Sequence, residues 1–597
     1  MDYFFEDLNK AQKKAAFFVD GASLILAGAG SGKTRVLIAK VVYLIKKKKI
    51  SPSSIMMTTF TNKAAFEMKE RIEKELGSYV KLGYVGTFHS FGSLVLRRFW
   101  KEAGIRRNFL IYDENDQLSL IRDILKKEKI EKLSPSFFIY YISLAKNEMI
   151  SPEDFFERFS FYKKNLVAQV YYLYQKLLEK NNALDFDDLL LKTVILFKKN
   201  LYVLDFYQRQ LNYFLIDEFQ DTNFLQYELI KILASKAKHI SSVGDFSQSI
   251  YSWRGAKMEN LFRFQKDFSK VSLFYLEKNY RSTQKILDFA YQIISQNQSH
   301  PILKLYTDKD EGEEVKFFEA ENEEEEAVFV AREILKIGKK PEFFGENIAV
   351  LYRTNAQSRI FEEVFLHFGI PYILIGGVRF YERKEIKDIL AFLRLLIYST
   401  DQLALERVKK LGKKRFVAFK NFYEKINSNF ESYSTSEIIE IILKETDYLS
   451  FYQSGSEEDL SRLENINELK TVASNFPNLI DFLDQVALVE AEYFEGEKKE
   501  DGKNKVRLMT LHQAKGLEFD YVFIVGVEEG LIPHSRSFDD YESLEEERRL
   551  FYVGITRAKK KLYISFAKKR FIFGRSYYCL KSRFLEGVLK NDDSYSW

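Results

Sequence analysis

The sequence predicts an α/β protein with two parallel β-sheets, each in a domain that carries a mainly helical insertion. Three observations support this prediction. Short apolar runs of strand length alternate with helical patterns in two stretches of the 597-residue chain, as they do in parallel sheets flanked by helices. A glycine-rich segment directly follows the first apolar run. Two long blocks without strand-like spacing interrupt the two stretches.

The apolar runs give the positions of the expected strands. In the first stretch the expected strands cover residues 23–27, 55–59, 214–217, 240–243 and 271–276. In the second stretch they cover residues 315–318, 348–353, 372–375, 506–510, 521–525 and 562–566. The chain then divides into a first sheet domain (1–90 plus 200–275), a helical insertion (91–199), a second sheet domain (276–377 plus 506–597) and a second helical insertion (378–505). Only residues 496–505 have the composition of a flexible linker.

Composition and charge exclude several classes of protein. The single cysteine, Cys579, rules out an intramolecular disulfide or a cysteine-rich metal site. The net charge of +5 neither requires nor excludes nucleic acid binding, because a local basic groove would suffice. No signal peptide and no apolar stretch of membrane-spanning length is visible, so we expect a cytoplasmic protein, in the bacterial cytosol or nucleoid. The charge runs 46–49 and 323–326 are expected to be solvated helix ends.

The segment AGAGSGKT, residues 27–34, lies between an expected strand and an expected helix, which is the context of a phosphate-binding loop. Its glycines allow backbone N–H groups to approach phosphate oxygens that a Cβ would keep away. Lys33 can place a positive charge on the outer phosphates, and the hydroxyl of Thr34 can ligate Mg²⁺. The alternative is a glycine-rich turn without a ligand. The flanking strand and helix favour the phosphate loop.

A second expected strand ends in Asp217 and Glu218. An aspartate at a strand end can hold the Mg²⁺ shell, and the glutamate after it can orient and deprotonate the attacking water. Alone, such a pair is often only a charged strand end. Together with the glycine-rich loop in the same series of strands, it predicts an ATPase.

Further strings accompany this pair in a fixed order. They are LNKAQ (8–12), TTFTNKAAFEMKERI (58–72), GTFHSF (86–91), DEFQDTN (217–223), VGDFSQSIYSWRGA (243–256), LEKNYRS (276–282), VRLMTLHQAKGLEFDYVFIVGVEEGLIPH (506–534) and EEERRLFYVGITRAKKKLYIS (545–565). In sequence and order they resemble the motifs of the superfamily 1A DNA helicases of the UvrD/Rep/PcrA type. The resemblance implies two RecA-like parallel-sheet P-loop domains. The second helical insertion looks shorter than is usual in that family.

The resemblance also implies ATP and Mg²⁺ as cofactors, bound in a cleft between the two cores. The implied nucleotide-binding residues are Gln12, Ala27, Gly28, Ala29, Gly30, Ser31, Gly32, Lys33, Thr34, Arg35, Tyr280 and Glu518. Among these, Gln12 would read the adenine, Tyr280 would stack on it and Glu518 would contact the ribose. The implied metal ligands are Thr34 and Asp217. The implied catalytic residues are Glu218, Gln248, Arg281 and Arg557, with both arginines supplied by the second core as arginine fingers.

On the DNA side, the resemblance and the residue types point to aromatic stacking. The expected DNA-binding residues are Phe60, Asn62, His89, Tyr251, Trp253, Arg254, Arg353 and His512. Phe60 and Trp253 would stack on bases, although core packing is the commoner role of a phenylalanine in so Phe-rich a chain. His89 and His512 could equally be structural hydrogen-bond partners.

The implied function is an ATP-dependent 3′-to-5′ translocase on single-stranded DNA and a DNA helicase, acting in repair, replication or recombination. Its implied partners are single-stranded DNA, single/double-strand junctions and repair or replication proteins. Two alternatives stay open: a translocase that strips bound proteins with little unwinding, and an ATP-switched DNA-binding clamp. One departure from the family pattern is Ser247, where the family usually has an acidic residue. This departure bears on the coupling between ATP and DNA.

Overall fold

The chain folds into two units, each built around a six-stranded parallel sheet. Unit 1 comprises Met1–Arg281 and His300–Asp308, and unit 2 comprises Ser282–Ser299 and Lys309–Trp597. The structure is a computed structural model that describes residues 3–130, 133–161, 163–338, 347–426, 432–498, 505–572 and 575–588. Within these ranges no helix is both long enough and apolar enough to cross a membrane.

The sheet of unit 1 has the strand order β3-β2-β6-β7-β1-β8, with every neighbouring pair parallel. Its strands are β1 (Gly21–Ala27), β2 (Ile55–Thr58), β3 (Tyr84–Gly86), β6 (Tyr213–Ile216), β7 (His239–Gly244) and β8 (Ser272–Leu276). Because all six strands run the same way, their carboxyl ends meet at one edge of the sheet. The loops that follow β1, β2, β6 and β7 therefore start close together.

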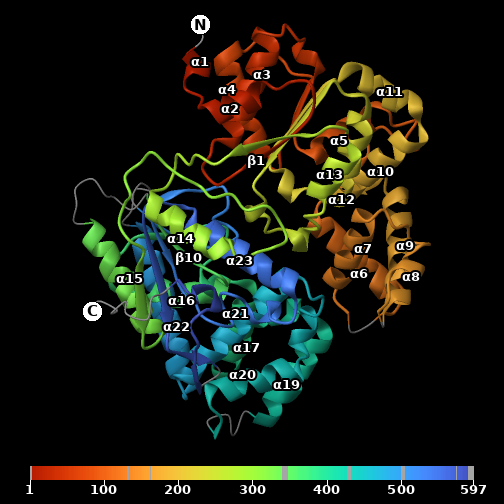
Figure 1. Ribbon diagram of the computed structural model, residues 1–597. Coiled ribbons are helices and arrows are strands. Elements are labelled where there is room, and N and C mark those ends of the chain that lie inside the picture. Colours follow the sequence, from red (N-terminus) through yellow and green to blue (C-terminus); the bar gives the residue numbers. More distant parts are fainter. Residues whose placement is uncertain are drawn as a thin grey trace. The chain divides into compact units, whose positions relative to one another are not determined.

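Helices cover both faces of this sheet (Figure 1). Alternate strand residues point to opposite faces, so Leu24 and Leu26 pack on one side while Ile25 packs on the other. The Ile25 side is covered by α2 (Lys10–Phe17), α3 (Lys33–Lys46) and α4 (Asn62–Leu76). The other side is covered by α5 (Phe88–Arg98), α10 (Phe186–Lys199), α11 (Leu201–Gln210), α12 (Phe224–Leu233) and α13 (Asn260–Asp267).

The first helical insertion has a hydrophobic core of its own. That core is built by α6 (Glu114–Lys127), α7 (Pro135–Asn147), α8 (Phe155–Arg158) and α9 (Lys164–Lys180), which Figure 1 shows grouped together in orange. Two short parallel strands, β4 (Leu110–Tyr112) and β5 (Ala183–Asp185), pair where the chain leaves and re-enters the main core. The helix α10 and most of α5 fall within the expected insertion 91–199, but both helices pack on the sheet of unit 1.

The sheet of unit 2 has the order β11-β12-β10-β13-β14-β9, again all parallel. Its strands are β9 (Lys316–Ala320), β10 (Ile348–Tyr352), β11 (Tyr372–Leu374), β12 (Val506–Thr510), β13 (Phe519–Ile524) and β14 (Ala558–Ala567). The helices α15 (Glu323–Gly338) and α16 (Ser358–His367) share a core with the sheet. A pair of helices, α14 (Gln284–Ile294) and α23 (Tyr541–Ile555), pack together through the rings of Phe289 and Phe551.

The second insertion is wholly helical in its described part and also has a separate core. It consists of α17 (Lys384–Ile397), α18 (Gln402–Lys410), α19 (Lys413–Ile426), α20 (Thr435–Glu445), α21 (Glu457–Ser474) and α22 (Leu479–Lys498). Of the expected linker 496–505, positions 496–498 end α22 and 499–504 lie outside the described residues. A small antiparallel pair, β15 (Lys569–Ile572) and β16 (Arg575–Tyr578), follows the last strand of the sheet.

The predicted fold class is confirmed, with a strand at every expected position. The expected division between the cores at residue 276 differs from the structure, in which residues 276–281 and 300–308 belong to unit 1. The expectation of a solvated helix end at 323–326 is wrong for Glu326, which is fully buried. Its carboxylate accepts hydrogen bonds from Arg570, the Gly526 amide and the Ser565 hydroxyl, at 2.7, 2.9 and 2.7 Å.

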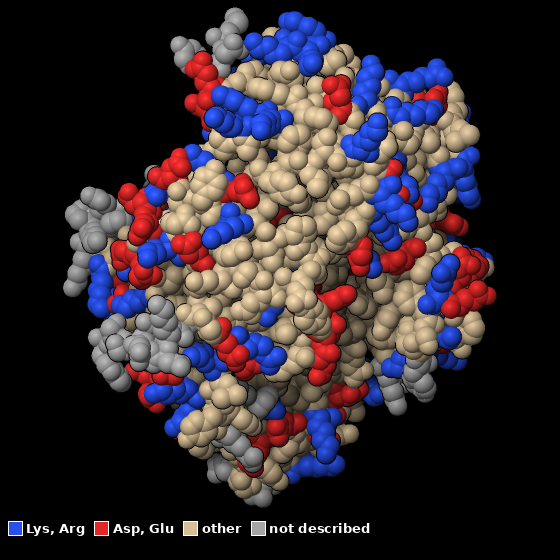
Figure 2. All heavy atoms as spheres, viewed as in Figure 1, with Lys and Arg blue, Asp and Glu red and all other residues tan. Residues whose placement is uncertain are grey.

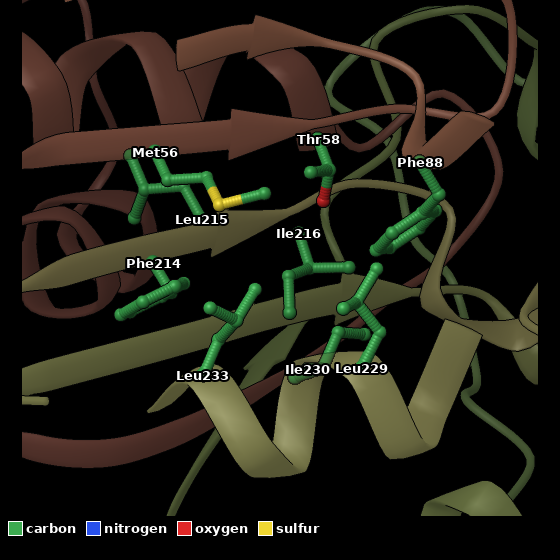
Figure 3. A pocket seen from close by; sticks show the side chains of 9 residues that line it. All are labelled: Met56, Thr58, Phe88, Phe214, Leu215, Ile216, Leu229, Ile230 and Leu233. Carbon is green, nitrogen blue, oxygen red and sulfur yellow. The ribbon is translucent and has the colours of Figure 1, made fainter. Parts of the chain in front are cut away.

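An apolar recess lies inside unit 1 between the sheet and α12. Figure 3 shows the side chains that line it: Met56, Thr58, Phe88, Phe214, Leu215, Ile216, Leu229, Ile230 and Leu233. Only Thr58 carries a polar side-chain atom, and its buried hydroxyl has no hydrogen-bond partner among the described residues. The recess is a gap in core packing, and it lacks the charged groups that a nucleotide would need.

A buried lysine lies at the amino ends of β1 and β7, and it has no carboxylate partner among the described residues. Lys40, on α3, is fully buried and donates hydrogen bonds to the carbonyl of Phe18 and to Nε2 of His239, the latter at 3.1 Å. The His239 Nδ1 faces the carbonyl of Gly21 at 2.8 Å, which fixes Nε2 as the acceptor. Burial lowers the pKa of Lys40 to about 7. Lys40 thus ties the end of α2 to the first residues of β1 and β7.

This site predicts a pH-dependent stability that Lys40→Met removes. Between pH 7 and 10.5 the unfolded chain holds a proton on Lys40 that the folded chain has released, so the lysine adds a slope of at most about 1.4 kcal/mol per pH unit. Urea denaturation across this range should show the wild type gaining stability relative to Lys40→Met as the pH rises. Lys46→Met, at the exposed end of the same helix, is the control and should keep the wild-type slope. Parallel pH profiles for wild type and Lys40→Met would contradict the assignment.

Candidate nucleotide site and nucleic-acid interface

The glycine-rich loop connects the end of β1 to the first turn of α3. Gly30 and Gly32 have φ values of 64° and 85°, a region that favours glycine. A Cβ on Gly30 would lie 2.7 Å from Nδ2 of Asn279, and one on Gly32 would lie 2.9 Å from Nε2 of Gln12. No side chain caps the amino end of α3, where Gly32 is the N-cap. Its N–H groups are therefore available to an anion.

Lys33 reaches the ends of the neighbouring strands. Its Nζ lies 3.4 Å from the carbonyl oxygen of Ala27 and 3.9 Å from Oδ2 of Asp245, just after β7. The same Asp245 oxygen accepts a hydrogen bond from Nε2 of Gln248 at 2.7 Å. Gln248 is thus connected to the lysine of the loop through one carboxylate.

The acidic pair follows β6, next to β7 in the sheet. Burial, and then the neighbouring Glu218, raise the pKa of Asp217 to about 7, although the Lys33 ammonium opposes this shift. Glu218 adopts a left-handed backbone conformation, with φ of 49°, which is unusual for a residue other than glycine. Its Oε2 accepts a hydrogen bond from Nε2 of Gln220 at 2.5 Å. The carbonyl oxygen of the same Gln220 side chain accepts from the Asp245 amide at 3.1 Å.

These residues fit a nucleoside triphosphate with Mg²⁺. The glycine cradle has no room for side-chain atoms, and the amino end of α3 favours a negative charge. The raised pKa of Asp217 reflects a buried carboxylate beside a second one, a repulsion that a bound cation would offset. Lys33 and the loop amides would hold the phosphates, and Thr34 and Asp217 would hold the metal.

The region expected to read the base is organised by hydrogen bonds. Gln12 is buried; its Nε2 donates to the carbonyl of Ser31 at 2.9 Å, and its Oε1 accepts from the Asn9 amide at 3.0 Å. Asn9 donates in turn to the hydroxyl of Tyr280 at 2.9 Å, and the Tyr280 side chain is 40% exposed. Arg35 pairs with Asp7 at 3.0 Å on the surface. Gln12 and Tyr280 are therefore both joined to Asn9.

Arg281, expected from the second core, is the last residue of the first segment of unit 1, and its catalytic role stays a prediction. After β8 the chain is bound to the glycine-rich loop: the Tyr280 amide donates to the carbonyl of Gly30 at 2.9 Å, and Asn279 Nδ2 donates to the carbonyl of Ala29 at 2.6 Å. The Asn279 Oδ1 accepts from the Arg281 amide at 2.7 Å. Arg281 is thus held beside the loop by its own segment.

The remaining expected residues of the nucleotide site lie in unit 2. Arg557 is 1% exposed, and its guanidinium donates to the carbonyls of Val553 and Leu517 at 2.9 and 3.1 Å. Glu518 forms an ion pair with Lys559 at 2.7 Å. Their roles toward a nucleotide stay predictions.

Three aromatic side chains form a connected surface on unit 1, which we call the aromatic platform: Phe60, Tyr251 and Trp253. The rings of Phe60 and Tyr251 are stacked, with centroids 5.5 Å apart and an interplanar angle of 7°. Trp253 meets Tyr251 edge-on at 6.3 Å and is 43% exposed. Phe60 follows β2, and the other two rings follow β7. Phe60 is partly buried against Tyr251, and its role toward a base stays a prediction.

The other expected DNA contacts differ in their surroundings. Asn62 is exposed at the start of α4. His89 meets the ring of Phe186 edge-on at 6.0 Å, and burial lowers its pKa to about 4, so it is neutral at pH 7. In unit 2, Arg353 forms a bidentate ion pair with Glu547, with Nη2 to Oε1 at 2.7 Å.

Burial opposes ionisation of Glu547, but the ion pair and hydrogen bonds with Arg353 hold the pKa of that carboxyl below its usual value, and His512 adds a smaller contribution in the same direction. The side chain of Arg254 lies outside the described part of the chain. The DNA roles of all these residues stay predictions.

Sequence reasoning missed four residues that the structure brings to the site: Asp245, Gln220, Asn279 and Phe186. The first three lie inside the strings VGDFSQ, DEFQD and LEKNYRS, so their motifs could have revealed them. Phe186 is 49% exposed beside His89, and its string DFDDLL carried no sign of exposure. Ser247 stands where the family usually has an acidic residue. Its buried hydroxyl contacts Nε2 of His300 at 3.0 Å.

The glycine-rich loop after β1, the acidic pair after β6 and the all-parallel sheet define a P-loop nucleoside triphosphatase with two RecA-like domains. Comparison with known families makes the class specific. Residues 8–269 match the UvrD/REP helicase N-terminal domain, and residues 274–418 and 408–569 match the UvrD-like helicase C-terminal domain.

Among curated proteins, the chain is 41% identical to the ATP-dependent DNA helicase PcrA of Staphylococcus aureus (strain Mu50 / ATCC 700699), over 100% of this chain and 88% of that protein. It is 42% identical to the ATP-dependent DNA helicase PcrA of Bacillus subtilis (strain 168), over 97% of this chain and 85% of that protein. The chain therefore belongs to the UvrD/Rep/PcrA-like superfamily 1A helicases, and its enzyme class is that of an ATP-dependent DNA helicase.

The contacts of Gln220 predict a positioning role that can be separated from nucleotide binding. In Gln220→Ala, Glu218 loses its side-chain donor, so we expect the kcat of ATP hydrolysis to fall about 10- to 100-fold while the KM for ATP stays within about twofold. Steady-state ATPase kinetics measure both constants. Gln208→Ala removes another buried glutamine with two side-chain hydrogen bonds and should leave kcat unchanged. An equal fall in both variants would show that only stability is affected.

Proposed function

We propose that this helicase binds ATP and Mg²⁺ at the glycine-rich loop and uses the hydrolysis cycle to move 3′ to 5′ along single-stranded DNA and to part the duplex ahead of it. The observation that carries this proposal is the aromatic platform, which follows β2 and β7 in the same sheet that holds Lys33 and Asp217. The 3′-to-5′ direction rests on the family resemblance.

The charges of the nucleotide site support a hydrolytic role. Glu218, which accepts a hydrogen bond from Gln220 at 2.5 Å, would orient and deprotonate the attacking water. The Lys33 ammonium, 3.9 Å from Asp245, offers positive charge toward transferred phosphate. Bound Mg²⁺ would supply further charge neutralisation to the phosphates.

The DNA side supports movement without sequence preference. Stacking a base on an aromatic ring contributes about 1–3 kcal/mol, and opening one duplex step costs about 1.4 kcal/mol. Because these terms nearly cancel, binding alone gives no direction, and the nucleotide cycle must provide it. On the face shown in Figure 2, basic and acidic side chains are interspersed and do not form one basic field. Contacts with the phosphate backbone should nevertheless make binding sensitive to salt.

Unwinding of tailed duplexes tests the direction. With ATP and Mg²⁺ we expect strand separation from a 3′-tailed duplex and none from a 5′-tailed duplex. Lys33→Ala and Glu218→Gln should abolish it, because the first removes the phosphate-binding charge and the second the base. Lys176→Ala and Glu179→Gln, two exposed residues of α9, are matched controls and should unwind normally. Equal unwinding from 5′ tails would exclude the proposed polarity, and rapid ATP turnover without unwinding would favour the protein-stripping alternative.

Trp253→Ala tests the aromatic platform. Losing one stacked base should weaken binding to single-stranded oligo-dT about 5- to 150-fold, the equivalent of about 1–3 kcal/mol. Fluorescence anisotropy at fixed low salt measures the Kd. The control is Tyr172→Ala, because Tyr172 is 42% exposed, close to the 43% of Trp253, but lies on α9. Similar affinities for wild type and Trp253→Ala would remove the platform from the binding site.

A further inference from the structure

The carboxyl end of α7 touches three segments of the unit 1 core. Three consecutive residues there, Lys146, Asn147 and Glu148, each contact a different partner, and we call them the α7 junction. Lys146 is fully buried and pairs with Asp185 at 2.6 Å and Asp188 at 3.0 Å, at the start of α10. Because breaking a buried ion pair costs several kcal/mol, this contact is a fixed attachment.

The second residue of the junction forms a chain of side-chain hydrogen bonds. Asn147 Oδ1 accepts from Nδ2 of Asn223 at 2.7 Å. Asn147 Nδ2 donates to Oδ1 of Asp187 at 3.0 Å and to the carbonyl of Ser143 at 2.9 Å. Hydrogen bonds of this kind contribute only about 1 kcal/mol each, and Asn147 is only partly buried. Unlike the Lys146 ion pair, the amide chain can form and break at low cost.

Asn223 is joined to the acidic pair, Asp217 and Glu218, by a short stretch of chain. It follows Glu218 by a single 3-10 turn, Phe219–Asp221, and Thr222. The Asp221 amide donates to the carbonyl of Glu218 at 2.9 Å, which fixes the geometry of this turn. A change in the backbone of Glu218 would therefore shift the Asn223 side chain that meets α7.

The same segment is joined to the loop that carries Trp253. Asn223 forms a β-bridge with Ala256, and the Lys257 amide donates to the carbonyl of Thr222 at 3.0 Å. The ammonium of Lys257 pairs with Glu148, the third residue of the junction, at 3.0 Å. Asn147 and Glu148 thus contact both the segment that follows Glu218 and the segment that follows Trp253.

We propose that Asn147 is a positioning residue that transmits the state of the nucleotide site to the first helical insertion. The insertion has its own core and is held at the α7 junction by one fixed and two exchangeable contacts. Lys146 acts as a pivot, while the bonds of Asn147 and Glu148 follow the Asn223 and Lys257 segments. This inference rests on the proposed function, because it assumes that ATP binds beside Glu218.

Amide hydrogen exchange of the full-length protein, with and without Mg²⁺ and the ATP analogue AMP-PNP, tests the inference. The reporters are the amides of Glu148, Met149 and Ile150, which donate to helix carbonyls at 3.1, 3.0 and 2.8 Å. In the wild type we expect AMP-PNP to change their exchange rates several-fold. Asn147→Ala should abolish this response. Asn181→Ala, which removes the hydrogen bond to the Tyr112 hydroxyl within the same insertion, should keep it.

A second pair of variants distinguishes transmission from simple destabilisation. Asn223→Asp keeps an oxygen that can accept from the Gln226 amide and cap α12, but it loses the donor to Asn147, so the response should disappear. Adding Asp187→Asn allows the side-chain hydrogen bonds to run in the opposite direction. Asn147 then turns its amide over, donates to position 223 and accepts from position 187, and it gives up the Nδ2 hydrogen bond to the Ser143 carbonyl. The double variant should regain the nucleotide response, whereas a merely structural role predicts additive loss.

The outcomes are separate from those of the unwinding assay. A wild-type α7 junction whose exchange ignores AMP-PNP overturns the inference, as does a normal response in Asn147→Ala. Both results can occur in a protein that unwinds 3′-tailed DNA. Conversely, an intact exchange response in a protein that does not unwind would keep the inference and reject the proposed function. As a further readout, Asn147→Ala should lower the base pairs opened per ATP without changing the KM for ATP.

Discussion

The parallel alignment of β1, β6 and β7 is the constraint on which the rest of unit 1 depends. The three strands end at one edge of the sheet. Lys33 follows β1, and the carboxylates of Asp217 and Asp245 follow β6 and β7, so the three charged groups lie close together. Neither carboxylate is favourable there as an anion on its own: burial raises the pKa values of Asp217 and Asp245, and Lys33 opposes both shifts. The sheet therefore brings together a set of charged groups, and a bound phosphate and a bound metal ion would balance their charges.

Uncharged amide side chains connect this charged set to its surroundings. Gln220 joins Glu218 to Asp245, Gln12 joins the loop to Asn9, and Asn279 joins the loop to the segment after β8. An amide can donate and accept at once, so it can link groups of either charge without adding charge to a crowded site. The Asn147 chain extends the same arrangement to the insertion. Amide side chains thus set the positions of the groups that do the chemistry.

Much of this architecture could be predicted from the sequence. Apolar runs bounded by turns located the strands of both sheets, since buried parallel strands are short and continuous in hydrophobicity. Motif strings located Lys33, Asp217, Glu218 and the aromatic platform. Two features resisted prediction. The three-residue strand β3 is too short for a pattern, and the packing of α5 and α10 on the sheet depends on which surfaces face each other in three dimensions.

Arg281 and Glu326 show the same limit at single positions. A motif string identifies Arg281, but only the folded chain shows that its segment is bound to the glycine-rich loop, through the Asn279 side chain and the Tyr280 amide. Glu326 lies in a run of four acids, and only the folded chain shows that it faces Arg570 inside the protein while the first three open the helix. Residue type is visible in a sequence. The partner across the fold is not.

The pairing of β4 with β5 bears on how the first insertion can change during evolution. Leu110 and Ala183 are register partners, so the chain leaves the core and returns to it at adjacent points. The helices between these two strands build a hydrophobic core of their own, separate from the cores on the two faces of the sheet. Such an arrangement makes the insertion an exchangeable module: its length and outer surface can be remodelled by mutation or by grafting, provided that the two anchoring strands and the residues that meet them are kept.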